Sequence, residues 1–201
     1  MIHRSWVSGD HCNSQVLTIA LLHRSWILGK WYVVQYYASS EEALSYRCMR
    51  EVFTMATDRP EVSMNFTYIF TDDPEGEKLV GNITWRIPNG NKPAHWVHAE
   101  DSYEGVYNTY VLDWEPKSWA LLLHCAEKSG SPRYLSSFIM SRRPDVAPNV
   151  VSYLREKLPR YDIDLDYMFP MSQENCSGGG GRPGFDPRIL TNVKHPMKVS
   201  H

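Results

Sequence analysis

The cysteines are the residues with the most direct chemistry in this chain. There are four of them, spread widely through 201 residues, and none belongs to a Cys-x-x-Cys pair. This spacing disfavours a zinc knuckle or a thioredoxin-type redox motif. An even number of widely spaced cysteines suits two structural disulfides formed in an oxidising compartment, and four buried free thiols are the alternative. The four are Cys12, Cys48, Cys125 and Cys176.

The histidines predict no comparable site. His95, His98 and His124 do not have a spacing that connects them to a metal. We therefore expect solvated or core histidines, with no metal and no cofactor.

Three Asn-x-Ser/Thr sequons favour an extracellular protein. Two of them begin at Asn65 and Asn82, which are the candidate glycosylation sites. The third, Asn175-Cys176-Ser177, contains a cysteine, and a disulfide there would hinder modification. Secretion is the expectation, although residues 1–15 are polar and the apolar stretch 16–22 is too short to be a convincing signal peptide.

Composition bounds the class of protein. The formal net charge is -2, so the chain lacks the excess of positive charge that is typical of proteins that bind nucleic acid or an anionic membrane. No apolar run approaches the roughly 18 residues of a membrane span. Hydrophobic residues make up 42% of the chain and aromatic residues 12%, which supports a substantial core in one domain.

The elements that position these residues are short strands. Gly29 precedes Trp31 by two residues and opens a run of β-branched and aromatic residues, so we expect a sharp turn followed by a half-buried strand. Turn signals such as Asp73-Pro74-Glu75-Gly76 divide the segments that follow, as in an antiparallel meander. The predicted strands cover residues 31–37, 48–55, 61–71, 78–87, 94–99, 105–114, 119–125 and 134–141.

Eight antiparallel strands can close into a barrel that removes exposed edges. The expected fold is therefore all-β, an eight-stranded up-and-down barrel with one C-terminal helix over residues 150–158 packed outside. Residues 1–26 form an irregular N-terminal segment and 27–176 the barrel plus helix. Residues 177–201 begin with a glycine run and predict a disordered tail.

This arrangement resembles the lipocalins. The resemblance rests on Gly29-x-Trp31 in the first strand and on Arg142 in Ser141-Arg142-Arg143-Pro144 at the end of the last strand. It implies that the Arg142 guanidinium lies over the Trp31 indole at the closed end of the barrel, a cation–π contact worth on the order of 1–2 kcal/mol. A one-residue slip would exchange Arg142 for Arg143. Both Trp31 and Arg142 then have a structural role, away from ligand.

The layout of the cysteines resembles that of a subgroup of the family, which contains apolipoprotein D and the insect proteins Lazarillo and bilin-binding protein. The resemblance implies the disulfides Cys12–Cys125 and Cys48–Cys176. A further lipocalin motif, between the sixth and seventh strands, is matched by Leu112-Asp113-Trp114, which retains its aspartate as Asp113 but lacks the usual threonine.

The function that the resemblance implies is that of a secreted carrier, with a small hydrophobic ligand in the barrel: a lipid, fatty acid, retinoid, sterol or bilin. Binding would be driven by the burial of apolar surface, which contributes about 25 cal/mol for each Å² removed from water. A cell-surface receptor is a further expected partner, and the chain is expected to be a monomer or weak dimer. The candidate wall residues are Val33, Gln35, Trp85, Trp96, Tyr107, Phe138 and Met140.

Two other functions remain open. Some lipocalins resemble prostaglandin D synthase, an isomerase-like enzyme with a free cysteine in the barrel; Cys48 is the candidate here, and a disulfide would consume it. The second is an interaction protein of the cell surface or extracellular space, in which the barrel is filled by its own aromatic side chains and the outer surface acts. We expect no enzyme.

Overall fold

The computed structural model describes residues 24–40, 45–98, 106–127 and 133–176 of the chain. In these ranges, eight antiparallel strands follow one another around a closed barrel, as the sequence predicts. Each strand pairs with the next, and β1 pairs with both β8 and β2. The strands are β1 (Gly29–Ala38), β2 (Tyr46–Met55), β3 (Glu61–Phe70), β4 (Leu79–Arg86), β5 (His95–His98), β6 (Val106–Glu115), β7 (Trp119–Glu127) and β8 (Tyr134–Ser141).

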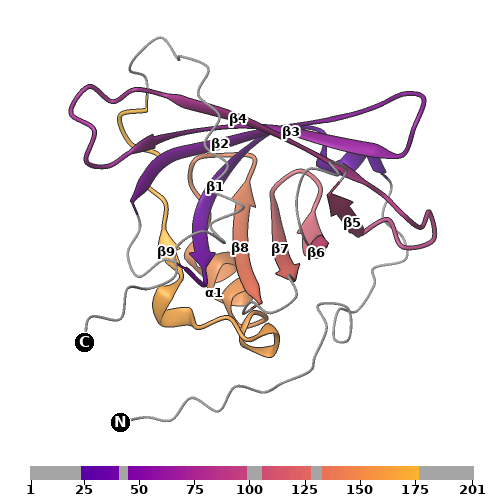
Figure 1. Cartoon of the computed structure of the whole chain (residues 1–201). Helices are drawn as coiled ribbons and strands as arrows, with labels where there is room; N and C mark the ends of the chain where they lie inside the picture. Colours follow the sequence, from indigo (N-terminus) through magenta and orange to yellow (C-terminus); the bar gives the residue numbers. More distant parts are fainter. Residues whose placement is uncertain (1–23, 41–44, 99–105, 128–132, 177–201) are drawn as a thin grey trace, which may run out of the picture.

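Figure 1 shows β2, β3 and β4 crossing over the layer formed by β1, β8, β7 and β6. Successive side chains of a strand point to opposite faces, so every strand contributes to an inner and an outer surface. In β3, for example, Val62, Met64, Phe66 and Tyr68 are buried in the inner cluster. The core is therefore the inside of the barrel.

A second apolar cluster lies outside the barrel. The helix α1 (Pro148–Arg155) packs there, against the outer faces of β1, β7 and β8 (Figure 1). Its Leu154 is fully buried together with Leu121 of β7 and Ile139 of β8. The helix in the structure begins two residues before the predicted start and ends three residues before the predicted end. It ends early because the chain passes into short 3₁₀ turns at Pro159–Tyr161 and Leu165–Tyr167.

The sequence did not predict the segment that follows these turns. We call residues 169–176 the strap; it begins with a ninth strand, β9 (Phe169–Pro170), paired with β1. Direct pairing of β1 with β2 spans only Gly29–Tyr32, and the strap occupies the gap beyond it. The strap residue Met171 donates its N–H to the Val34 carbonyl, and Cys48 donates its N–H to the Ser172 carbonyl. Nonlocal pairing of this kind leaves no periodic signal in so short a segment.

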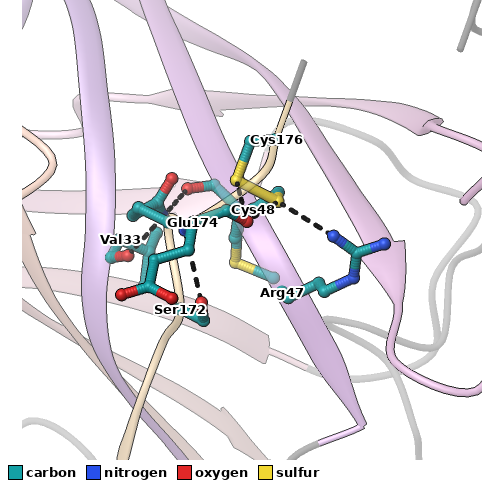
Figure 2. Close-up of a disulfide and its surroundings, with 8 residues drawn as sticks. Val33, Arg47, Cys48, Ser172, Glu174 and Cys176 are labelled. Atoms are coloured by element: carbon teal, nitrogen blue, oxygen red, sulfur yellow. Dashed lines mark hydrogen bonds between the residues drawn. A yellow bond between two sulfur atoms is a disulfide. The ribbon is translucent and has the colours of Figure 1, made fainter. Parts of the chain in front are cut away.

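The disulfide Cys48–Cys176 fastens the strap to β2, as Figure 2 shows. Cys48 has a left-handed backbone conformation, with φ of 60°, at a register shift between Arg47 and Arg50. A β-bulge of this kind re-aims a side chain. It places the Cys48 sulfur on the outer surface, buried with Ile69 and Cys176.

The folded unit also begins earlier than the predicted boundary at residue 27. A 3₁₀ turn, Arg24–Ile27, precedes β1, and Trp26 belongs to the inner cluster. The remainder of the predicted N-terminal segment and the predicted tail at 177–201 lie outside the described residues. Within the described ranges, no helix has the length and apolarity needed to cross a membrane.

Candidate functional site: the barrel interior

One end of the barrel is closed by stacked side chains. Arg142 lies over the Trp31 ring, with its guanidinium carbon 3.6 Å from the ring centroid. The same guanidinium donates to the carbonyls of Trp26 at 2.7 Å and Lys30 at 2.9 Å. Trp31 is fully buried, and its indole N–H donates to the Ile27 carbonyl at 2.6 Å. These residues form a plug that joins the 3₁₀ turn, β1 and the end of β8.

The plug depends on two local choices in the sequence. Gly29 has φ of +88°, a conformation that side-chain-bearing residues rarely adopt. Arg142 makes the contacts with the plug, whereas Arg143 points outward and pairs with Asp145 at 3.0 Å. The alternative register, with Arg143 over Trp31, is therefore not the one in the structure.

Five of the seven predicted wall residues lie in the inner cluster: Val33, Trp85, Trp96, Phe138 and Met140. Tyr107 is half-buried and packs against that cluster. Gln35 lies on the outer side, where its side-chain oxygen accepts a hydrogen bond from Arg155 of α1 at 2.7 Å.

A β-bulge explains the position of Gln35. The register of β1 against β8 shifts between Val33 and Gln35, so two successive residues, Val34 and Gln35, face outward. Beyond the bulge Tyr36 takes the inner position that strict alternation assigns to Gln35. A bulge of one residue moves each later side chain of the strand to the opposite face of the sheet, and no residue type at this point of the sequence indicates a bulge.

Aromatic rings meet across the interior. Trp85 of β4 stacks on His124 of β7 with ring centroids 6.1 Å apart, and Phe53 of β2 lies 6.2 Å from Trp96 of β5. These pairs join strands that are not neighbours in the sheet, so the rings span the inside of the barrel. Further contacts extend the network through Phe138, Tyr36, Tyr46, Tyr68 and Phe70.

The interior also holds polar groups that the sequence reasoning did not select. His124 is buried and its ring nitrogen Nδ1 lies 2.8 Å from the Thr109 hydroxyl. Burial lowers the pKa of His124 to about 3, so the ring is neutral at physiological pH. Ser136 faces His124 in the adjacent strand, and its buried hydroxyl has no hydrogen-bond partner among the described residues.

Glu51 is the most unusual of these groups. Its side chain is 2% exposed, and burial raises the pKa of its carboxyl to about 8. A signal for it exists in the sequence, because Glu51 stands between Met49 and Phe53 at the alternating positions of one strand. An acidic residue at an inward position of such a strand predicts a buried carboxyl.

At the opposite end of the barrel, Phe70, Leu79 and Tyr107 are partly buried and pack on the inner cluster, as Leu28, Met55 and Trp114 do at the Trp31 end. Three of the connections at this end, residues 41–44, 99–105 and 128–132, lie outside the described residues. The inner apolar surface thus continues to this rim.

Asp113 has a structural position outside the barrel. One oxygen of its carboxylate accepts hydrogen bonds from the Tyr153 hydroxyl and, at 2.9 Å, from the Lys157 ammonium. The other oxygen accepts the Trp114 N–H at 2.8 Å. Asp113 therefore ties β6 to the helix region rather than to the interior.

The cysteines carry no free thiol in the described residues. Cys48 and Cys176 are joined, which leaves Cys48 without the thiol that the enzyme alternative requires. Cys125 is disulfide-bonded, and Cys12, its expected partner, lies outside the described residues. Among the described side chains, no group of three or more His, Cys, Asp or Glu could hold a metal ion.

The two candidate glycosylation sites face each other on the outer surface. Asn65 of β3 and Asn82 of β4 are exposed and directly opposite in register. The Asn82 amide donates to the Asn65 side-chain oxygen at 2.7 Å.

Comparison with known proteins identifies the fold. No family model matches the sequence, and no curated protein matches it. Among solved structures, apocrustacyanin C2 and lobster apocrustacyanin A1 each superpose with a TM-score of 0.58 and 20% identity, over 76% of this chain and 80% of theirs. The siderocalin Ex-FABP superposes with a TM-score of 0.58 and 17% identity, over 74% of this chain and 95% of its own. The chain therefore has the lipocalin fold.

Proposed function

We propose that the barrel binds a small hydrophobic ligand and carries it in aqueous surroundings. The observation that supports this function best is the continuous inner surface of apolar and aromatic side chains, plugged at the Trp31 end and reaching the rim at Phe70, Leu79 and Tyr107. A ligand there would be removed from water on most of its surface. The solved barrel Ex-FABP is described as acting through dual ligand specificities, which supports the same reading of the fold.

A specific observation favours a second function. The ring contacts between Trp85 and His124 and between Phe53 and Trp96 fill the space across the barrel. A ligand must displace some of these rings. If they do not move, the barrel is a solid scaffold and the function lies on its outer surface, in contact with a receptor or another extracellular partner.

Tryptophan fluorescence separates the two functions. The protein is titrated with a fluorescent fatty acid, retinol, a bilin and a conjugated aromatic amine. The carrier function predicts saturable quenching by at least one of them. Substituting the inner Trp85 by Phe should reduce that quenching, whereas Trp119→Phe, which alters the outer cluster, should leave it unchanged. Absence of saturable quenching with all four probes would overturn the carrier function.

The remaining expectations belong to the same proposal. Two features support a secreted protein: the disulfide Cys48–Cys176 and the exposure of Asn65 and Asn82 for glycosylation. Similarity to the apolipoprotein D subgroup rests on the cysteine pattern of the sequence. Expression in a secretory eukaryotic host, followed by glycosidase treatment and mass measurement, tests the glycans; two unoccupied asparagines would contradict this part.

A further inference from the structure

Glu51 belongs to the inner wall of the barrel. It lies in β2 between Met49 and Phe53, which both belong to the inner cluster. Across the neighbouring strands it is directly opposite Trp31 of β1 and Phe66 of β3, which are also inside. Residues directly opposite in a sheet point to the same face. Its side chain is 2% exposed, so the carboxyl is enclosed by the barrel.

The described residues provide no charge partner for this carboxyl. The oxygen Oε2 is buried and has no hydrogen bond. The nearest basic residue in sequence, Arg50, lies over the Tyr32 ring at 5.3 Å, on the outer face of the sheet. Arg142 is engaged in the plug with Trp31. Burial is the only cause of the raised pKa of the Glu51 carboxyl, and no charged group among the described residues contributes to it.

Folding alone does not explain an acid at this position. Enclosing an unpaired carboxyl costs free energy, and an apolar residue of similar size would avoid that cost. A binding site does explain it, because a ligand can supply the missing partner. The partner that restores most to an enclosed carboxylate is a cation, and the surrounding aromatic faces also attract organic cations.

We propose that Glu51 anchors the protonated amino group of a hydrophobic organic amine whose apolar body lies among the inner aromatic rings. This proposal rests on the carrier function proposed above and names the class of ligand. When the Glu51 carboxyl is ionised, the same geometry disfavours an anionic lipid, because two negative charges would then meet inside the barrel. Unbranched Met49, next to Glu51 on the inner face, is a side chain that can rearrange to admit the amine.

Three probes with one tail test the preference. Octylammonium, octanol and nonanoate share an eight-carbon apolar chain and differ in the charge of the end group. Calorimetric titration at about pH 9, above the pKa of Glu51 and below that of an alkylamine, isolates that charge. A charged hydrogen bond contributes about 1.5–3 kcal/mol, so we expect the amine to bind roughly 10- to 100-fold more tightly than octanol. Nonanoate should bind more weakly than octanol.

Two variants complete the experiment. Glu51→Gln should abolish the advantage of the amine while retaining the binding of octanol. Glu156→Gln, which makes the same change on the exposed surface at the end of α1, should behave like the original protein. An amine that binds no more tightly than octanol, or an advantage that survives Glu51→Gln, overturns the role of Glu51 while leaving the carrier function standing. Failure of all three probes to bind overturns this inference together with the carrier function for simple amphiphiles, and circular dichroism of each variant verifies its fold.

Discussion

Two single residues of this barrel affect the stability of the fold in opposite directions. Arg142 illustrates the favourable end, because one guanidinium satisfies two backbone carbonyls and covers the face of Trp31. Glu51 illustrates the unfavourable end, since its buried oxygen Oε2 has no hydrogen bond. Arg142 closes one end of the barrel, and the proposed amine ligand would supply the partner that Glu51 lacks.

Replacing Arg142 tests the plug. Arg142→Ala removes the cation–π contact and leaves the carbonyls of Trp26 and Lys30 without their donor, so we expect the free energy of unfolding to fall by about 2–4 kcal/mol. Arg142→Lys should recover only part of this loss, because one ammonium lacks the planar fork that reaches both carbonyls. Urea denaturation measures the effect.

The neighbouring arginine provides the control for this measurement. Arg143 is exposed and pairs with Asp145, so Arg143→Ala should leave the unfolding midpoint unchanged within error. Equal effects of the two alanine substitutions would contradict the assignment of Arg142 to the plug.

At the scale of elements, the strap completes the barrel wall where β1 and β2 separate. The Gln173 side-chain amide donates to the carbonyl of Val33 at 2.8 Å and to that of Met49 at 2.9 Å, so one side chain bridges the two strands. Met171 adds its side chain to the inner cluster. The strap therefore connects β1 to β2 beyond Tyr32, where the two strands do not pair with each other directly.

Removing the disulfide should loosen the strap before the rest of the barrel. The bond joins residues 128 apart in sequence, for which the chain-entropy model gives a stabilisation of about 4–5 kcal/mol. In the double variant Cys48→Ser/Cys176→Ser we expect a loss of about 2–5 kcal/mol. Hydrogen exchange should accelerate most at the N–H groups of Met171 and residue 48, which bond across the seam.

The ladder between β6 and β7 serves as the internal reference for that experiment, since it pairs along nine residues without the strap. Uniform acceleration over both regions would contradict an independent opening of the strap. Loss of protection confined to the strap and its seam would support it.

At the scale of the whole molecule, two buried groups shape the dependence of stability on pH. The raised pKa of Glu51, about 8, means that its contribution is complete below its unfolded value of 4.5 and is lost as pH rises through 8. The lowered pKa of His124, about 3, means that its contribution is complete above 6.5 and is lost as pH falls through 3. These two effects cancel between about pH 4.5 and 6.5.

Glu51→Gln should remove the loss of stability at higher pH. Relative to the original protein, we expect the variant to gain about 2–4 kcal/mol of unfolding free energy between pH 4.5 and pH 8. Urea denaturation at several pH values in that interval measures the difference. A difference that does not change with pH would show that Glu51 does not titrate differently in the folded and unfolded states.

The sequence by itself determined the strands and the barrel through local signals, and its resemblance to the lipocalins implied the plug. Alternating apolar residues define strand faces, turn residues separate the strands, and Gly29, Trp31 and Arg142 stand at recognisable positions near the first and last strands. The helix was also predicted from its spacing. Each strand and the helix is encoded within a few residues of sequence, whereas the contact of Arg142 with Trp31 joins residues more than a hundred positions apart.

Only the tertiary structure decided which residues of β1 point into the barrel, how the strap joins β1 to β2, and that Glu51 is enclosed without a partner for Oε2. The bulge after Val33 sends Gln35 outward and Tyr36 inward, and its geometry arises from pairing with β8 rather than from residue type. The strap joins β1 and β2 across more than a hundred residues of chain. The isolation of Glu51 is a property of all the strands together, because a carboxyl lacks a partner only when every neighbouring element has been placed.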